Sequence, residues 1–164
     1  QPDLKLILVP RHANRAAEIE TLITETRFSC AIRSQNELPI ETDDIYLADT
    51  VGEMGLWYSS AAITFVAGSL VPVGGHTPYE PAAYGSALIH GSQYSNFQAI
   101  YEQLVTSKGS LQADTAEDIA EAWLRLLNKD MREAQIDAAK NALFKNSDKD
   151  QMIGKVVLKV ASLL

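Results

Sequence analysis

Residues 68–81 read Gly-Ser-Leu-Val-Pro-Val-Gly-Gly-His-Thr-Pro-Tyr-Glu-Pro, and this stretch is the most informative part of the chain. An apolar, strand-like segment, 62–67, precedes it, and a helix-like segment, 82–84, follows it. Thr77 and Glu80 form the Thr-x-x-Glu pattern of a helix start, with Pro78 at the first helical position. A glycine-rich turn between a strand and a helix offers free N–H groups and a helix dipole to an anion. The stretch therefore predicts a phosphate-binding loop, or a plain turn if Thr77 and Glu80 only cap each other.

Composition places the chain among ordinary globular proteins. It has 164 residues, of which 46% are hydrophobic and 21% charged, as expected for one domain with a sizeable core. The net charge of −7 argues against a nucleic-acid partner. The single cysteine, Cys30, excludes an intramolecular disulfide. It lies in an apolar run, so we interpret it as a buried, inert thiol. We find no signal peptide and no stretch long enough to span a bilayer.

Strand and helix patterns alternate along the chain. This alternation predicts an α/β fold, a Rossmann-like parallel sheet with helices on both faces. The expected strands are 4–9, 28–33, 44–47, 62–67, 87–90 and 110–113. The expected helices are 13–27, 52–60, one starting at Pro78, 97–107 and most of 115–164, including a C-terminal helix over 148–164.

Ligands of such sheets bind at the carboxyl ends of the strands, and that rule selects the candidate residues. Arg11 follows the first strand and suits a phosphate or carboxylate, although it could also be a solvated surface arginine. Glu53 and Glu80 follow the third and fourth strands and suit hydrogen bonds from sugar hydroxyls or a base edge. His76 could donate to an anion or stack in the turn, and His90 could equally be structural.

Several chemistries lack their motifs. No Gly-x-Gly-x-x-Gly follows the first strand, and there is neither a Walker lysine pattern nor a Gly-x-Ser-x-Gly elbow. Asp148 and Asp150 lie in a lysine-rich, helical tail, which favours a solvated helix start over a metal site. We therefore expect no metal.

Three blocks of the chain resemble the 3-deoxy-D-manno-oct-2-ulosonic acid (Kdo) transferases of lipid A glycosylation. They are Pro-Arg-His at 10–12, Asp-Thr-Val-Gly-Glu-Met at 49–54, and Gly-Gly-His-Thr-Pro-Tyr-Glu-Pro-Ala-Ala at 74–83, the last preceded by Gly-Ser-Leu at 68–70. Ser-Asn-Phe at 95–97 resembles a further family element. The family usually has His-Asn-Pro-Leu-Glu where this chain has His-Thr-Pro-Tyr-Glu at 76–80.

The resemblance implies the C-terminal, donor-binding half of a GT-B glycosyltransferase, with residues 1–164 forming a single domain of a longer two-domain enzyme. The donor would be CMP-Kdo and the acceptor a lipid A precursor, with no metal or other cofactor. The catalytic base and the membrane anchor would belong to a missing N-terminal domain, so this fragment would be soluble and inactive alone, whereas the whole enzyme would work at the cytoplasmic face of the bacterial inner membrane. The implied CMP-site residues are Pro10, Arg11, Val51, Gly52, Glu53, Met54, Gly74, Gly75, His76, Thr77, Pro78, Tyr79 and Glu80.

Two other functions remain open from the residues alone. Another nucleotide-sugar transferase or an epimerase, using a UDP-sugar, would meet the same phosphate with the same strand, glycine loop, helix and glutamate. A non-catalytic nucleotide-binding or protein-interaction module would need no upstream domain. Comparing the binding of CMP with that of UDP distinguishes the first alternative from a Kdo transferase.

Overall fold

The structure is a computed structural model that describes residues 4–145. The predicted helix over 148–164, with Asp148 and Asp150, lies outside the described residues. The chain divides into two units, Gln1–Ala61 and Ala62–Leu164, which we describe separately.

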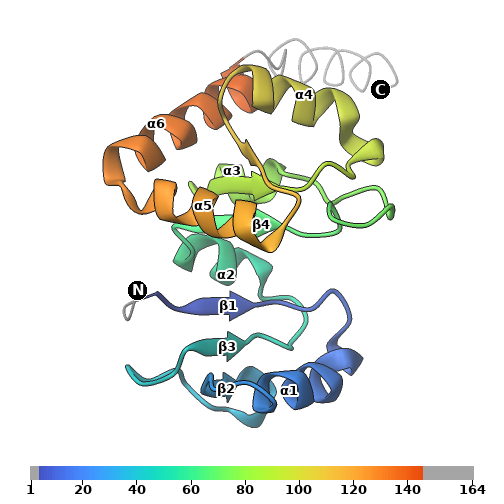
Figure 1. Cartoon of the computed structure of the whole chain (residues 1–164), viewed down its shortest axis with the longest axis vertical. Coiled ribbons are helices and arrows are strands. Elements are labelled where there is room, and N and C mark those ends of the chain that lie inside the picture. The colour runs from blue at the N-terminus through green and yellow to red at the C-terminus, as the bar shows by residue number, and fades with distance from the viewer. Residues whose placement is uncertain (1–3, 146–164) are drawn as a thin grey trace, which may run out of the picture. The chain divides into compact units, whose positions relative to one another are not determined.

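Unit 1 is a three-stranded parallel sheet with two helices (Figure 1). The sheet order is β1-β3-β2, and Leu8 of β1 and Ile32 of β2 both pair with Leu47 of β3. The core joins Ala31, Tyr46, Ala48 and Trp57, with the ring of Trp57 edge-on to that of Tyr46 at a centroid distance of 5.6 Å. In chain order, the elements are β1 (Leu6–Leu8), the 3-10 turn η1 (Ala13–Arg15), α1 (Ala16–Thr24), β2 (Cys30–Ile32), the 3-10 turn η2 (Arg33–Gln35), β3 (Ile45–Leu47) and α2 (Met54–Ser60).

Unit 2 holds a second three-stranded parallel sheet, in the order β4-β5-β6 (Figure 1). Its helices follow the strands closely, so that a helix or a turn connects each strand to the next. The elements are β4 (Ile63–Val66), α3 (Tyr79–Ala83), β5 (Ala87–His90), the 3-10 turn η3 (Ser95–Phe97), α4 (Gln98–Thr106), β6 (Leu111–Gln112), α5 (Ala116–Leu127), α6 (Lys129–Lys140) and a π-helical turn, η4 (Asn141–Lys145).

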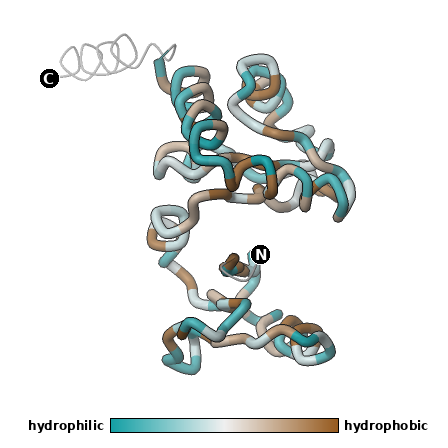
Figure 2. The backbone as a smooth tube through the Cα atoms, turned by 60° about the vertical axis from the view of Figure 1, so that its left-hand side comes forward, coloured by the Kyte–Doolittle hydropathy of each residue, from teal (hydrophilic) through white to brown (hydrophobic). Residues whose placement is uncertain are grey.

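The central strand β5 divides the core of unit 2 into two faces. Leu88 belongs to a cluster with side chains from α3, α4 and α6, whereas Ala87 and Ile89 belong to a second cluster, with side chains from α5. Helices therefore cover both faces of this sheet, because successive residues of a strand point to opposite sides. Figure 2 shows hydrophobic and hydrophilic residues alternating along the helices of this unit, as expected for helices with one face on a core.

The predicted α/β class, the six strands and their parallel direction are confirmed. The strands form two three-stranded sheets instead of the single sheet that we expected, because an apolar run predicts a strand but not its pairing partner. Most elements are shorter than predicted by one to three residues at an end. The long helical stretch after residue 115 divides at Asn128, whose side chain accepts a hydrogen bond from the Met131 N–H and caps α6.

Candidate functional site

The glycine loop of unit 2 runs from the end of β4 to the start of α3. Three of its glycines have positive φ: 72° at Gly68, 95° at Gly74 and 77° at Gly75. Other residues adopt such values only with strain. At Gly74 a Cβ atom would also lie 2.2 Å from the Asn96 side chain, which would have to move. The backbone of this loop therefore requires glycine at these positions.

Ser69 ties the start of the loop to the carboxyl end of β5. This residue is fully buried, and its hydroxyl donates to the Val66 carbonyl (2.6 Å) and accepts from the Gly91 N–H (2.8 Å). Its own carbonyl accepts from the Gln93 N–H at 2.8 Å. The segments after β4 and β5 therefore converge, as the rule for the carboxyl ends of parallel strands predicts.

Three further hydrogen bonds hold the second half of the loop. The Gly75 N–H donates to the Gly68 carbonyl (3.0 Å), the Asn96 N–H to the Gly74 carbonyl (3.1 Å) and the Tyr101 hydroxyl to the His76 carbonyl (2.8 Å). Both Gly74 and Gly75 are buried. The amide of Gly75 therefore closes the loop on itself, and the expectation that it is free for an anion is wrong.

The helix after the loop begins one residue later than predicted. Pro78 is the N-cap of α3, a five-residue helix without a side-chain capping bond. Thr77 lies before the cap, and its hydroxyl is 3.5 Å from the Tyr79 nitrogen, at the limit of a hydrogen bond. The predicted capping box of Thr77 and Glu80 is therefore absent, which leaves the Glu80 side chain, exposed in the first turn, outside any cap.

The remaining residues of 74–80 differ in how they face solvent. The ring of His76 lies against Gly68, where a Cβ atom would come within 3.1 Å of Cδ2. This contact favours the interpretation that the ring stacks in the turn. Tyr79 is 40% exposed, and its ring contacts Phe144 at a centroid distance of 6.0 Å. Pro78 is buried and Thr77 half-buried.

In unit 1, Glu53 is the centre of a polar cluster at the ends of β2 and β3. The guanidinium of Arg33 donates to both carboxylate oxygens, from Nε at 3.1 Å and from Nη2 at 2.9 Å, and the Thr50 hydroxyl donates to Oε2. The hydrogen bond from Arg33, followed by that from Thr50, lowers the pKa of the Glu53 carboxyl. In return, the hydrogen bond and the charge of Glu53 raise the pKa of Arg33. Glu53 is therefore ionised at neutral pH and fixed in orientation.

A second carboxylate fixes the neighbouring turn. Asp49 is buried and accepts hydrogen bonds from the backbone N–H (2.9 Å) and the hydroxyl (2.6 Å) of Ser34. The segment after β2 is thereby joined to the segment after β3. Asp49 therefore has a structural role in this connection, and its partner Ser34 is exposed.

The other predicted residues of unit 1 lie at the same edge of its sheet. Pro10 is half-buried and Arg11 exposed, just beyond the end of β1. Val51 is 89% exposed, and Gly52 has a φ of 91° with open space around it. Met54 is 37% exposed at the first position of α2. Parallel pairing of β1 and β2 with β3 brings these segments to one edge.

Sequence reasoning missed the residues that hold the predicted ones. Arg33 and Tyr101 contact Glu53 and His76 across 20 and 25 positions of the chain. The position of Arg33 at the end of a predicted strand was a usable signal, because the same rule had selected Arg11. Tyr101 lies within a helix, where the sequence pattern indicates only a core residue.

His90 is structural. It is fully buried, with Nδ1 2.8 Å from the Gly91 carbonyl and Nε2 3.0 Å from the Ser110 hydroxyl. Because a carbonyl only accepts, Nδ1 carries the proton and Nε2 accepts from the serine. Burial lowers the pKa of His90, which keeps it neutral. Cys30 is half-buried instead of buried, and desolvation raises the pKa of its thiol.

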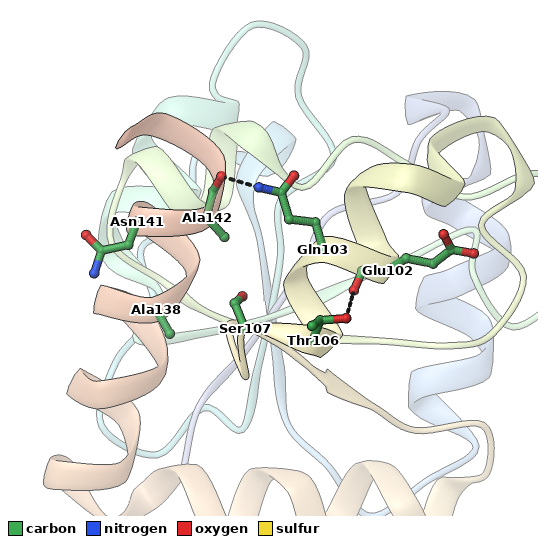
Figure 3. A pocket seen from close by; sticks show the side chains of 7 residues that line it. All are labelled: Glu102, Gln103, Thr106, Ser107, Ala138, Asn141 and Ala142. Carbon is green, nitrogen blue, oxygen red and sulfur yellow. Dashed lines mark hydrogen bonds between the residues drawn. The ribbon is translucent and has the colours of Figure 1, made fainter. Parts of the chain in front are cut away.

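In the described part of the chain, neither a metal cluster nor the hollow between α4 and α6 marks the site. Within residues 4–145, no group of three or more His, Cys, Asp or Glu side chains could hold a metal ion. A hollow of about 670 Å³ lies between α4 and the end of α6 (Figure 3), where the Gln103 amide donates to the Ala142 carbonyl at 2.7 Å. Five of its seven lining residues are exposed, and none of them is a predicted site residue. We interpret it as a shallow groove between two helices.

Comparison with solved structures identifies the class of protein. The chain is similar to the crystal structure of the C-terminal CMP-Kdo binding domain of WaaA from Acinetobacter baumannii, with a TM-score of 0.84 and 31% sequence identity over 88% of this chain and 76% of that chain. The fold is therefore that of the C-terminal half of a GT-B glycosyltransferase.

Comparison with curated proteins gives the family. The 3-deoxy-D-manno-octulosonic acid transferase of Haemophilus influenzae is 40% identical over 147 residues, covering 88% of this chain and 34% of the relative. The enzyme of the same name from Rickettsia bellii is 37% identical over 117 residues, covering 71% of this chain and 28% of the relative. A search of family descriptions gives no match. The chain belongs to the Kdo transferase family, and it spans about a third of the length of these relatives.

Among the helices of the described part of the chain, none has the length and apolar character needed to cross a membrane.

Proposed function

We propose that residues 1–164 form the donor-binding domain of a glycosyltransferase that moves Kdo from CMP-Kdo to a lipid A precursor in lipopolysaccharide core biosynthesis. The observation that carries the proposal is the likeness to a CMP-Kdo binding domain, at 31% identity and a TM-score of 0.84. The blocks at 10–12, 49–54 and 74–83, which first indicated the family, lie at strand ends and in the glycine loop, where a ligand of an α/β sheet is expected.

In unit 2, we assign the phosphate of CMP to the segment 76–80. Gly74 and Gly75 are buried, and the Gly75 N–H is bonded within the loop, whereas Tyr79 and Glu80 are exposed. Backbone N–H groups at the start of a helix favour an anion. The exposed carboxylate of Glu80 suits the ribose hydroxyls, because an ionised carboxylate only accepts hydrogen bonds.

In unit 1, Arg11 is assigned to the phosphate or to the carboxylate of the donor. Its side chain is exposed and, among the described residues, forms no salt bridge, in contrast to Arg33. The role of Glu53 is narrower than predicted from the sequence. A carboxylate accepts about four hydrogen bonds, and Arg33 and Thr50 already supply three. Glu53 therefore has room for roughly one bond to the donor, with Val51, Gly52 and Met54 as its exposed neighbours.

Transfer of the sugar needs further groups, which we assign to another domain of the enzyme. As CMP departs, negative charge develops on its phosphate, and donors preorganised at that position stabilise it. The general base is assigned to an N-terminal acceptor domain and the site of action to the cytoplasmic face of the inner membrane. No metal or other cofactor is assigned. The chain alone should therefore bind the donor without transferring the sugar.

A residue-level titration tests the proposal. In amide NMR spectra, CMP should shift the signals of residues 10–12, 51–54 and 76–80. Arg11→Ala should weaken CMP binding by about tenfold or more, the effect of removing one partner of a charge-assisted contact. Arg27→Ala is the matched control, since Arg27 is also an exposed arginine of unit 1 but lies beside the ring of Phe28. Shifts confined to other residues, or none at millimolar CMP, would reject the proposed site.

A further inference from the structure

We propose that Tyr101 is a positioning residue for the donor site: its hydroxyl fixes the carbonyl of His76 and so sets the position of the segment 76–80. This inference rests on the proposed function, because it concerns the loop to which we assign the CMP phosphate. Nothing in the family motifs assigns Tyr101, which lies on α4, 25 positions beyond the loop residue that it contacts.

The Tyr101 hydroxyl reaches the loop from the core of unit 2. The side chain is fully buried, and its hydroxyl donates to the His76 carbonyl at 2.8 Å. The His76 side of this bond is half-buried, so water competes with it less than with the same bond at the surface. The bond joins α4, a core helix, directly to the loop.

Neighbouring rings prevent the tyrosine from swinging. The Tyr101 ring is 4.4 Å from the His90 ring and stacks on that of Tyr94, with a centroid distance of 4.8 Å and an interplanar angle of 28°. His90 is itself held at both ring nitrogens, by Gly91 and Ser110. A continuous set of contacts therefore leads from the end of β5 and the residue before β6, Ser110, through His90 and Tyr101 to the His76 carbonyl.

The anchor acts on the residues between His76 and the part of α3 that the core holds, Pro81 and Ala82. The helix α3 has five residues and no side-chain cap. An isolated helix of this length is not stable by itself. The anchor at His76 and the closure of the loop by Gly75 and Gly68 hold the segment on its N-terminal side, whereas the burial of Pro78 and the contact of the Tyr79 ring with Phe144 hold it on the other side. Losing one constraint should lower the fraction of molecules with the loop in its binding position, and the apparent affinity falls by that fraction.

The test is Tyr101→Phe, which removes the hydroxyl and leaves the ring stack in place. We expect about a 3- to 10-fold weaker binding of CMP, the range that corresponds to one net hydrogen bond, together with faster hydrogen exchange of the Gly75 amide. Tyr46→Phe is the matched control. Tyr46 is also a buried tyrosine, and its hydroxyl donates to a loop carbonyl in unit 1, that of Glu37. This control should change neither quantity.

The outcomes separate this inference from the proposed function. If the unmodified chain binds CMP and Tyr101→Phe binds it equally well, Tyr101 is not a positioning residue. If the unmodified chain does not bind CMP, the proposed function fails, and the exchange rate of the Gly75 amide still decides whether Tyr101 holds the loop. If Tyr101→Phe does not fold, NMR of the Tyr101 hydroxyl proton in the unmodified chain tests the anchor instead. A Tyr101 hydroxyl proton that exchanges slowly and shows a nuclear Overhauser effect to Thr77 supports the anchor, and rapid exchange with solvent contradicts it.

Discussion

Replacing Gly91 by alanine should disturb the junction between the glycine loop and β5. A Cβ atom on Gly91 would lie 2.1 Å from the Ser69 carbonyl oxygen and 2.6 Å from its carbon, and both are backbone atoms that no rotamer change can move. Overpacking of this kind costs about 1–3 kcal/mol. The same shift strains the hydrogen bonds from Gly91 and Gln93 to Ser69, each worth about 1 kcal/mol. With these two bonds weakened but not broken, so that about half of their contribution is lost, we expect a total loss of about 2–4 kcal/mol of unfolding free energy.

Urea denaturation followed by circular dichroism measures this loss. A chain of this size should melt about 4–16 °C lower, since 1 kcal/mol corresponds to about 2–4 °C. Ser92→Ala is the control at the adjacent exposed position and should stay within about 0.5 kcal/mol of the unmodified chain. If Gly91→Ala were as stable as Ser92→Ala, a Cβ atom at position 91 would not clash with the Ser69 backbone.

Two further predictions concern charge. Arg33→Gln removes the first cause of the lowered pKa of Glu53, so that pKa should rise toward the ordinary value of about 4.3, as a carbon-13 NMR titration of the carboxyl would show; an unchanged value contradicts the assigned pairing. Burial lowers the folded-state pKa of His90, so its contribution to stability is present above its unfolded pKa of about 6.5 and is lost as the pH falls through the folded value. In His90→Gln the unfolding free energy should therefore change less between pH 7.5 and 5.5, and an identical slope in both proteins would be inconsistent with a buried neutral histidine.

The sequence predicts the fold class because the apolar runs and the turn residues agree along the chain. The run at 87–90 matches β5 residue for residue, since a fully buried strand is apolar on both faces. The pairing of strands is a long-range property with no local signal. The same patterns were therefore compatible with one sheet of six strands and with two sheets of three.

The capping prediction failed for a local reason. Thr77 and Glu80 match the capping pattern, but α3 begins after Pro78 and places Thr77 one position too early to cap it. The capping box of unit 2 is at Thr115 and Asp118, where each side chain bonds to the backbone N–H of the other residue. A pattern of two residues predicts a helix start but fixes its first residue only to within a position or two.

The family motifs led to the candidate site more directly than the chemistry of single residues did. Val51 and Gly52 carry no distinctive chemistry, and only the block around them selects them. The supporting residues needed the structure, because Arg33 and Tyr101 act through contacts across 20 and 25 positions of the chain. The sequence predicted Glu53 as an open hydrogen-bond acceptor, whereas in the structure its carboxylate already accepts three hydrogen bonds.

The central claim is that this domain recognises a cytidine monophosphate donor. Calorimetric titration of the chain with CMP and, in parallel, with UMP and UDP tests it most directly, since CMP and UMP differ only in the base. We expect saturable binding of CMP that is clearly tighter than that of UMP or UDP. Equal or tighter binding of the uridine nucleotides would contradict it and would favour a UDP-sugar enzyme.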